Sequence, residues 1–309
     1  MTTDDGDAAG DAPGDADGDP GTVAWFAVGD DESPAERVRH GSAPAPADWP
    51  TLAVESGVAA DEEEYYARLR EATVSATRAA VDERERADDR QLLHAVRAMD
   101  DAERVANELA ERVSEWAGTL FPDGGTGVDG CRAVAERDPE GPAEERVVSL
   151  ATRVADLADE ADELAAFIES RAPVAAPNLA ALAGPVLAAR LISLAGGLET
   201  LAKKPSGTLQ VLGAEDALFA HLRGHGSSPK HGIIYTHEYV RGTRPEDRGS
   251  ASRALAGKLT IAARIDHYAG DYRPELEAEL DERMRTIRAR APDANADGAD
   301  GADGGDADE

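Results

Sequence analysis

The sequence predicts a mostly α-helical protein with a small N-terminal α/β unit, a long antiparallel coiled-coil hairpin, an all-helical C-terminal domain and disordered acidic tails. Three observations lead to this class. Aromatic residues make up 4% of the 309 residues and charged residues 30%, which is typical of long helices rather than of a β-sandwich or barrel. Helix breakers are absent from Asp61 to Trp116. Apolar residues along two stretches recur every three or four positions, as on one face of a helix.

Both ends of the chain are strongly acidic. Residues 1–20 contain seven Asp and no base, and residues 291–309 contain six Asp, one Glu and no base. Neither end offers enough apolar surface to fold, so we predict two disordered tails. The whole chain carries 62 acidic against 32 basic residues, a net charge of −30. Such an excess of acidic residues keeps a protein soluble in a salt-rich cytoplasm. We therefore expect the protein to come from a salt-adapted organism.

Residues 21–60 are expected to form a small α/β unit. The run 22–28 (TVAWFAV) predicts one buried strand, and residues 51–54 predict a second. A short helix is predicted between them over residues 33–40, with serine as its N-cap and proline at its first position. A unit of this size buries too little apolar surface to be robust by itself.

A long helix is predicted from Asp61, and its second half carries an apolar stripe. The residues of this stripe follow one another at alternating spacings of four and three: Ala102, Ala106, Leu109, Val113, Trp116 and Leu120. Pro122 and the glycine-rich loop 123–130 are expected to end the helix.

A second helix, from about Pro142 to Arg171, carries an unbroken heptad seam. The seam consists of Val147, Leu150, Val154, Leu157, Ala161, Leu164 and Ile168. Because the remaining faces are strongly charged, the pattern favours a coiled coil. Residues 61–172 are therefore expected to form a helical linker and an antiparallel hairpin whose seam supports a homodimer. The alternative is that the stripe only packs onto a globular domain.

The composition changes at Pro173, where a domain over residues 173–290 begins that is rich in Leu, Ala and Gly. Small residues over 178–202 permit close packing of helices. After them we expect a turn at 203–207, an extended piece at 208–212, a helix at 214–222, a basic loop at 223–232, an extended or hairpin segment at 231–240, and helices at 250–269 and 274–290.

Residues 173–270 escape the acidity of the rest of the chain. They contain 11 bases and 7 acids, a net charge of +4, and they hold all four lysines and five of the seven histidines. A basic segment in an acidic protein indicates a polyanionic partner. The alternative is a buried core that has few acids for that reason alone.

Two short stretches of this basic segment are candidates for contact with nucleic acid. Gly213-Ala214-Glu215 stands at the predicted start of a helix, where free backbone N–H groups can face a phosphate. Lys230-His231 places a cation and an imidazole on one loop, where they can reach a phosphate or stack on a base. Three arginines complete the predicted RNA-binding set: Arg223, Arg248 and Arg253.

No signature of catalysis or of metal binding stands out. Gly257-Lys258 lacks the earlier glycine and the following Ser or Thr of a phosphate-binding loop. His221 and His225 are four residues apart, but no third ligand is spaced near them, so a zinc site is not favoured. Cys131 is the single cysteine, which excludes an internal disulfide. We therefore predict no enzymatic activity, no metal and no cofactor. Since no run of about 18 apolar residues is present, we expect a cytoplasmic protein.

Five blocks of the basic segment occur in the order of the Nop domain, and on these blocks the chain resembles that family. They are LISLAGGL (191–198), QVLGAE (210–215), PKHG (229–232), RGSASRALA (248–256) and KLTIAARID (258–266). Upstream, LLHAVRAMDD (92–101) and Trp116 resemble the coiled-coil region of the archaeal Nop-family scaffold.

The resemblance implies an all-helical Nop domain over residues 173–290 and a non-catalytic scaffold of box C/D guide-RNA particles, which direct ribose 2′-O-methylation of rRNA and tRNA. It implies as partners a guide RNA folded by a kink-turn-binding ribosomal-type protein, the methyltransferase fibrillarin held by residues 21–60, and a second copy of the chain. The alternatives are a splicing-factor-like Nop protein on another kink-turn particle and, less favoured, an enzyme that acts on RNA.

The chain departs from the family pattern at three cations. Asp216 and Ser250 stand where that pattern has lysine, and Ala220 stands where it has arginine. We therefore expect less of the RNA affinity to come from charge than in the family at large. The segment that precedes the predicted long helix is also shorter than the corresponding segment of the family.

Overall fold

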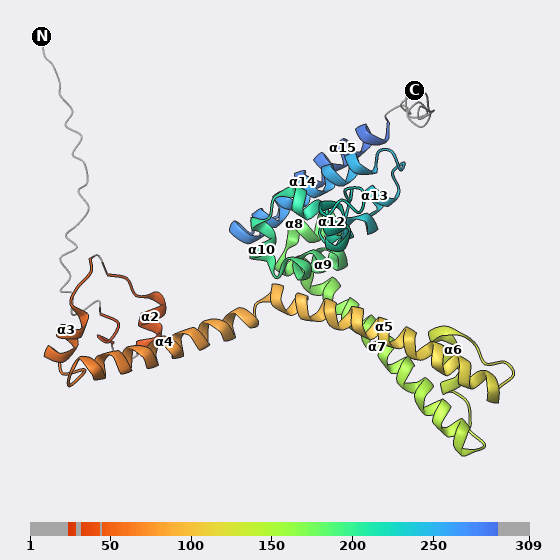
Figure 1. The fold of residues 1–309 in the computed structure, drawn as a ribbon, viewed down its shortest axis with the longest axis horizontal. Coiled ribbons are helices and arrows are strands. Elements are labelled where there is room, and N and C mark those ends of the chain that lie inside the picture. The colour runs from red at the N-terminus through yellow and green to blue at the C-terminus, as the bar shows by residue number, and fades with distance from the viewer. Residues whose placement is uncertain (1–23, 29–31, 44, 290–309) are drawn as a thin grey trace, which may run out of the picture. The chain divides into compact units, whose positions relative to one another are not determined.

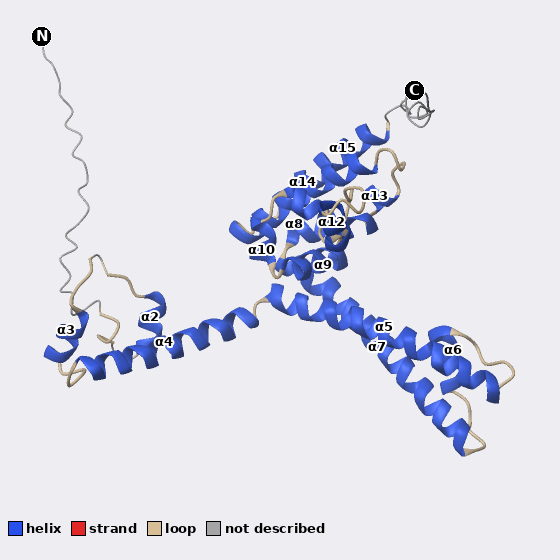
Figure 2. Cartoon of the chain, viewed as in Figure 1, coloured by secondary structure: helices blue, strands red, loops and turns tan. Residues whose placement is uncertain are grey.

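The computed structural model describes residues 24–28, 32–43 and 45–289, so the two predicted tails, 1–20 and 291–309, lie outside the described residues. The chain divides into two compact units, Met1–Arg86 and Ala87–Glu309. Within the described ranges the regular structure consists of fourteen α-helices and one 3-10 helix, without a strand (Figure 2). The prediction of a mostly helical protein is confirmed.

The described residues of the first unit form three helices: α2 (Pro34–His40), α3 (Trp49–Glu55) and α4 (Glu62–Glu85), red to orange in Figure 1. Each begins at a side chain that accepts a hydrogen bond from a backbone N–H of the first turn, namely Ser33, Asp48 and Asp61. Ser33 and Glu36 complete a reciprocal capping box, which satisfies two otherwise free donors. The helix predicted over residues 33–40 is confirmed.

The strands predicted in this unit are wrong for the residues described. Residues 24–28 form a turn in which the Ala27 N–H donates to the Ala24 carbonyl (3.0 Å), and residues 51–54 lie inside α3. A strand needs a neighbouring strand for its hydrogen bonds, and neither stretch has one. The Asp48 cap and Pro50 begin a helix in place of the second strand.

Aromatic packing holds the turn at residues 24–28 against α4. The Trp25 and Phe26 rings lie 5.6 Å apart edge to face, and Phe26 meets Tyr65 at 6.3 Å. The indole N–H of Trp25 donates to the Tyr65 hydroxyl (3.2 Å). With the buried Ala53 and neighbouring residues these rings form the core of the first unit.

In the second unit, α5 (Asp88–Leu120) and α7 (Pro142–Ala175) pack against each other along their lengths as an antiparallel pair (Figure 1). Asp88 at the start of α5 pairs with Arg171 near the end of α7 (2.5 Å). Val113 and Val147 share one core at the opposite end. The structure therefore joins the two predicted helices as a hairpin.

A further helix, α6 (Gly127–Ala135), begins inside the predicted loop 123–130 and continues beyond it. Cys131 and Val134 are buried against α5 and α7. Gly130 and Gly125 approach so closely that a Cβ on Gly130 would lie 2.3 Å from the Gly125 carbonyl carbon. The two glycines thus serve a close crossing of backbones as well as a turn.

The heptad seam of α7 divides into two rows. Val147, Val154, Ala161 and Ile168 are fully buried, whereas Leu150, Leu157 and Leu164 are half-buried. The first row lies in the core shared with α5 and the helices around it. The second row borders the same core and keeps part of its apolar surface accessible.

The unbroken helix predicted from Asp61 to Trp116 is interrupted between α4 and α5. Ala87 has the extended angles φ −61° and ψ 145°, although no glycine or proline is near. Asp89, in the first turn of α5, is buried, and its Oδ2 accepts a hydrogen bond from the Leu198 N–H (2.9 Å). Helix α5 therefore starts beside the Leu198 N–H, for which Asp89 provides the acceptor.

Six of the remaining elements pack against α14 (Arg248–Tyr268): α8 (Pro177–Ala183), α10 (Leu198–Lys203), α11 (Ser206–Gln210), the 3-10 helix η1 (Ile233–Thr236), α13 (Glu238–Arg241) and α15 (Glu275–Arg288). Helix α9 (Pro185–Ala195) packs against α5, α7 and α8, and α12 (Glu215–Leu222) follows α11 along the chain. Leu255 and Leu259 of α14 are fully buried in this core. No single helix in the described ranges is long and apolar enough to span a membrane; α8 and α9 meet that criterion only as a pair bent by 116°.

The extended segments predicted at 208–212 and 231–240 are wrong. The first lies mostly in α11, and the second contains η1 and α13. Both stretches hold β-branched or aromatic residues that favour strands, but their hydrogen bonds are made within tight turns, such as Tyr235 N–H to the Gly232 carbonyl (3.0 Å). Burial of Leu209 and Ile234 in the helical core outweighs the local preference.

A buried carboxylate joins the two ends of this bundle. Asp266 of α14 accepts hydrogen bonds from the backbone N–H (3.0 Å) and the side-chain amide (2.6 Å) of Asn178 and from the Leu179 N–H (2.8 Å). The Asn178 Oδ1 accepts in turn from the Arg273 N–H (2.7 Å). Asp266 thereby satisfies the free donors at the start of α8.

Candidate nucleic-acid interface

The loop that carries Lys230 and His231 crosses directly over the end of α11. The Gly232 N–H donates to the Gln210 carbonyl and the Ile233 N–H to the Leu212 carbonyl, both at 2.8 Å. The Gln210 side-chain amide donates to the Lys230 carbonyl (2.7 Å). A Cβ on Gly232 would lie 2.0 Å from the Leu212 carbonyl oxygen, so only glycine fits this crossing. The loop is therefore held in one position.

Three side chains stack beside this crossing, and we call them the stacked cluster: His231, Tyr235 and Arg248. The His231 and Tyr235 rings lie 4.6 Å apart with 23° between their planes. The Arg248 guanidinium carbon lies 5.4 Å from the centre of the Tyr235 ring, within the range of a cation–π contact. A Cβ on Gly249 would lie 4.0 Å from the Lys230 Cδ, which places Lys230 at the start of α14.

The charges of the stacked cluster are arranged so that its histidine stays neutral. Partial burial lowers the pKa of His231, and the positive charges of Arg248 and Lys230 lower it further. At neutral pH the imidazole is thus a flat, uncharged ring flanked by cations. Arg248 is partly occupied inside the protein, because its Nε donates to the Thr243 carbonyl (3.1 Å).

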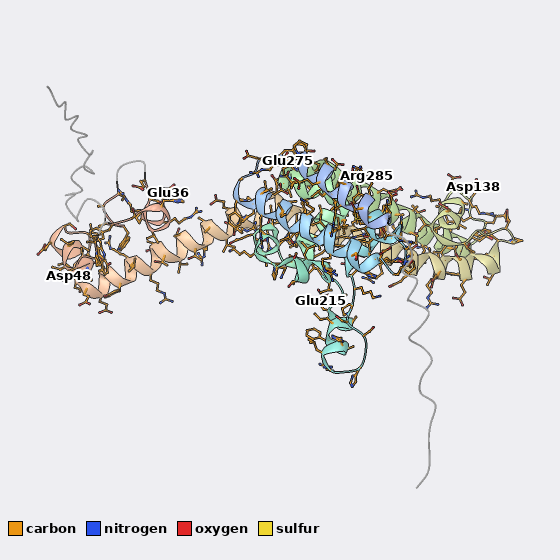
Figure 3. The ribbon with its side chains drawn as sticks, turned by 90° about the horizontal axis from the view of Figure 1, so that it is seen from above. Glu36, Asp48, Asp138, Glu215, Glu275 and Arg285 are labelled. Carbon is orange, nitrogen blue, oxygen red and sulfur yellow. The ribbon has the colours of Figure 1, made fainter. Side chains whose placement is uncertain are left out.

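Helix α12 forms a lobe that projects from the helical body, with Glu215 on it (Figure 3). None of its residues is buried, and Phe219 and Leu222 are 55% and 70% exposed. Gly213 before it has φ +83°, and its N–H donates to the Glu215 Oε1 (2.9 Å). The sequence pattern predicts that the Gly213 N–H is free to face a phosphate. This is wrong in the structure, because the Glu215 carboxylate of the same chain accepts the hydrogen bond.

The structure brings Lys230, His231 and Arg248 together and leaves the other two predicted arginines apart. Arg223 is exposed at the C-cap of α12, on the lobe. Arg253 is exposed on α14, where it lines a separate shallow hollow of about 430 Å³. Ala214 is the N-cap residue of α12, and its N–H donates to the Val211 carbonyl (2.9 Å).

The sequence analysis does not identify two groups of residues in this region. Tyr235 is the middle member of the stacked cluster, and its spacing of four residues from His231 is the one local signal for it. Phe219 and Leu222 are exposed on α12. The spacing of apolar residues along this short helix does not show whether they face a core or solvent. Their exposure is visible only once the lobe is known to project from the bundle.

Metal ligands do not converge in this region. No group of three or more His, Cys, Asp or Glu side chains within the described ranges is placed to hold an ion. His221, one of the two histidines four residues apart, has its Nδ1 at 2.9 Å from the Gly226 carbonyl oxygen. This contact closes the turn after α12.

A second histidine, His237, is packed behind the loop with a defined tautomer. Its Nδ1 accepts a hydrogen bond from the Tyr239 N–H (3.1 Å), so the proton is on Nε2, which faces the Leu182 carbonyl at 3.1 Å. Burial lowers the pKa of His237 below its ordinary value of 6.5. Protonation of Nδ1 would break the cap of α13.

This tautomer predicts a stability that depends on pH. Because the unfolded chain takes up the proton at an ordinary pKa while the folded His237 resists it, the contribution of His237 to the free energy of unfolding is complete above about pH 6.5 and falls as the pH drops below that value. Chemical denaturation at a series of pH values should show this slope, and His237→Asn, which keeps a cap acceptor but does not titrate, should flatten it. His231, whose pKa is lowered too, contributes in the same direction, so His231→Ala serves as the comparison. An equal slope in wild type and His237→Asn would contradict this assignment.

Comparison with known proteins gives a consistent family likeness. The family model described as the Nop "snoRNA binding domain, fibrillarin" matches residues 133–286. A NOP5 family protein of Methanocaldococcus jannaschii is 50% identical over 147 residues, which is 47% of this chain and 35% of that protein. Nucleolar protein 56 of Saccharomyces cerevisiae is 30% identical over 250 residues, 66% of this chain and 50% of that one.

A solved structure is also similar. A chain in the crystal structure of a fibrillarin/Nop5p complex has a TM-score of 0.49 and 25% sequence identity, covering 86% of this chain and 99% of that one. The present chain spans between about a third and a half of the length of the curated relatives named above.

Proposed function

From the premise that this chain is a Nop-domain protein, we propose that it is a non-catalytic scaffold of a box C/D guide-RNA particle. In this proposal the second unit binds guide RNA together with its kink-turn-binding protein. The first unit recruits fibrillarin, which supplies the methyl transfer to ribose 2′-hydroxyls. The family match over residues 133–286 and the nucleolar relatives support this assignment.

One observation carries the proposal. The loop that is fixed at Gly232 presents the neutral His231 ring between Lys230 and Arg248, in the basic segment 173–270 of an otherwise acidic chain. Sequence-tolerant RNA recognition uses aromatic rings on which unpaired bases stack, with cations beside them for the phosphates. The stacked cluster supplies the rings, and Lys230 supplies an exposed ammonium group. The fixed crossing at Gly232 means that little order has to be gained on binding.

The projecting α12 lobe fits the protein half of the same composite. Phe219 and Leu222 are exposed side by side on a helix of eight residues, and exposed apolar side chains of this size mark contact with protein. We infer that the RNA is read by the stacked cluster and that the kink-turn protein covers the lobe. Binding of both together would explain a modest positive charge on the RNA-facing segment.

The half-buried row of α7 supports the proposed homodimer. Leu150, Leu157 and Leu164 recur at every seventh position and keep part of their apolar surface accessible. A second copy of the hairpin would cover this row, which continues the heptad seam.

Removal of the loop's two reaching side chains tests the RNA role. Lys230→Ala with His231→Ala should raise the dissociation constant for the preformed complex of RNA and kink-turn protein about 10- to 100-fold, since a stacked base is worth about 1–3 kcal/mol. Circular dichroism should show an intact fold, because neither side chain is part of the core. His267→Ala at the far end of α14 is the control, and equal binding by the double variant and wild type would refute the assignment.

The same titrations have an unusual expected salt dependence. A chain of net charge −30 is repelled by RNA in dilute buffer, and molar salt shortens the Debye length to about 3 Å, which screens that repulsion. We therefore expect a shallow or inverted slope between about 0.2 and 2 M salt. A steep loss of affinity, as for a polycation that releases counterions, would show that phosphate contacts dominate.

A further inference from the structure

The last helix of the second unit, α15, ends beside the stacked cluster. The Arg288 Nε donates to the Thr243 hydroxyl (3.3 Å), and its Nη2 donates to the Glu238 carbonyl (3.2 Å). The Arg288 guanidinium carbon also lies 5.6 Å from the centre of the Tyr239 ring. The carbonyl oxygen of Thr243 accepts in turn from the Arg248 Nε (3.1 Å). The chain therefore leaves α15 at a point that two hydrogen bonds connect to the stacked cluster.

Three cations surround this point, and we call them the basic rim: Lys230, Arg241 and Arg248. The Arg241 carbonyl accepts from the Arg248 Nη2 (3.4 Å), and the Arg241 side chain is exposed. The two carboxylates that precede α14 pair with Arg244 instead, Glu246 at 3.7 Å and Asp247 at 2.8 Å. No member of the rim forms an ion pair with a carboxylate of the described ranges, although acidic residues outnumber basic ones by 62 to 32 in the chain.

The segment after α15 carries the opposite charge. Residues 291–309 hold six Asp and one Glu without a base, and from Asp297 to Asp306 an Asp occupies every third position. Three residues of extended chain span about 10 Å, and the five residues from Arg288 to Asp293 span up to about 17 Å. Gly and Ala make up most of the other positions, so no large side chain shields the carboxylates. The first acids of this segment can therefore reach the rim.

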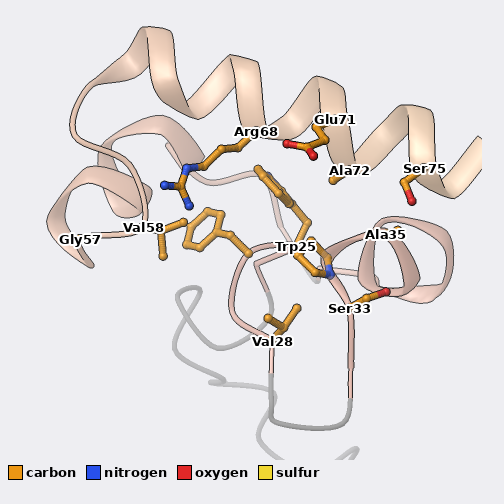
Figure 4. A pocket seen from close by; sticks show the side chains of 12 residues that line it. Trp25, Val28, Ser33, Ala35, Gly57, Val58, Arg68, Glu71, Ala72 and Ser75 are labelled. Carbon is orange, nitrogen blue, oxygen red and sulfur yellow. The ribbon is translucent and has the colours of Figure 1, made fainter.

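The aromatic hollow of the first unit offers these acids no comparable partner (Figure 4). It encloses about 570 Å³ and is lined largely by apolar side chains such as Trp25 and Val58. Arg68, the cation among its described lining residues, already pairs with Glu64 (2.7 Å). A carboxylate placed against apolar side chains loses hydration without gaining a partner, so charge complementarity favours the basic rim.

We propose that residues 291–309 dock on the basic rim of the same chain and compete there with RNA, as an internal inhibitor that salt releases. The inference rests on the proposed function in naming RNA as the competitor. A segment joined to its site by a few residues acts at an effective concentration of the order of millimolar. Each exposed ion pair is weak by itself, so several acids have to act together, and added salt screens all of them.

The test neutralises the segment in the full chain, with all six Asp replaced by Asn and Glu309→Gln. At about 0.1 M salt this variant should bind the RNA–kink-turn-protein complex about tenfold more tightly than wild type does, because the rim is no longer occupied. The difference should vanish above about 1 M salt, where the Debye length is about 3 Å. The affinity of the variant should therefore fall more steeply with salt than that of wild type.

The other end of the chain supplies a charge-matched control. Residues 1–20 contain seven Asp and no base, and they belong to the first unit. Replacing these seven Asp by Asn removes the same charge and should leave the RNA affinity within about twofold of wild type. An equal gain in both variants would assign the effect to repulsion by the whole chain, and no gain in either would show that the segment does not compete. Both outcomes would overturn the proposal.

A measurement without RNA separates the docking from the function on which the competition depends. The backbone amide resonances of Gly232 and Gly249, which border the rim, should shift in NMR spectra when residues 291–309 are neutralised, and they should stay in place in the control. Unchanged resonances would overturn the docking whatever the RNA does. Shifted resonances together with no RNA binding by wild type or variant would support the docking and overturn the RNA role of this surface.

Discussion

Replacing Gly232 by alanine is expected to abolish most of the binding to the RNA–kink-turn-protein complex, with a loss of about 100-fold or more. The new Cβ would meet the Leu212 carbonyl oxygen at 2.0 Å and the Val211 and Leu212 carbonyl carbons at 2.6 and 2.7 Å. All three are backbone atoms, so no change of side-chain rotamer relieves the contact. The loop must separate from α11, which breaks the hydrogen bonds from Gly232 and Ile233 and moves Lys230 and His231 away from the stacked position.

Overpacking of this kind costs about 1–3 kcal/mol of folding free energy, which thermal denaturation would measure beside the binding titration. Gly226→Ala is the matched control, because the same loop leaves open space around that position, and it should change neither quantity. Wild-type affinity in Gly232→Ala would mean that the loop rearranges without consequence and that the stacked cluster does not bind the RNA.

Val154→Asp should unfold the end of the α5–α7 hairpin that packs around Val113 and Val147. Val154 is 0% exposed, in a core that includes Val113 and Val147. A carboxylate buried there without a partner costs about 3–5 kcal/mol. The bundle around α14 lies in a different core, which also holds the start of α5 and the end of α7, so circular dichroism should show a partial loss of helix and denaturation should separate into two steps.

Leu157→Asp, three residues away, should behave differently. Leu157 belongs to the half-buried row, where a carboxylate can reach water. We expect the hairpin to remain folded and the homodimer to dissociate in light scattering, because the charge falls on the accessible part of the seam. A dimer that survives Leu157→Asp would place dimerisation elsewhere, and a fully helical Val154→Asp would show that this core tolerates a charge.

The helices of this protein follow closely from local patterns. The cap at Ser33 with Pro34, the heptad seam from Val147 to Ile168 and the start of α7 at Pro142 are all visible in the sequence, and the structure has helices at these places. Caps and amphipathic spacing are properties of neighbouring residues, so the chain does not need to be folded for them to be recognised.

The candidate interface divides in the same way. The PKHG and RGSASRALA blocks select Lys230, His231 and Arg248 from the sequence, and the structure places these three together. Tyr235 joins them only through the fold of η1. The N–H of Gly213 illustrates the opposite case, because a nearby Glu215 side chain occupies the donor that the helix start leaves free.

Composition, helical periodicity and the unequal distribution of charge are read along the chain, and they account for the helical class and for the basic segment of this protein. The break before α5, the helical state of residues 206–210 and 233–236 and the crossing at Gly232 are settled by contacts between residues far apart in sequence. Asp89 meets Leu198, Gly232 meets Leu212, and Asp266 meets Asn178. Such contacts outweigh local preference because a buried donor without an acceptor, or two backbones forced together, cost more than the small differences in propensity between helix and strand.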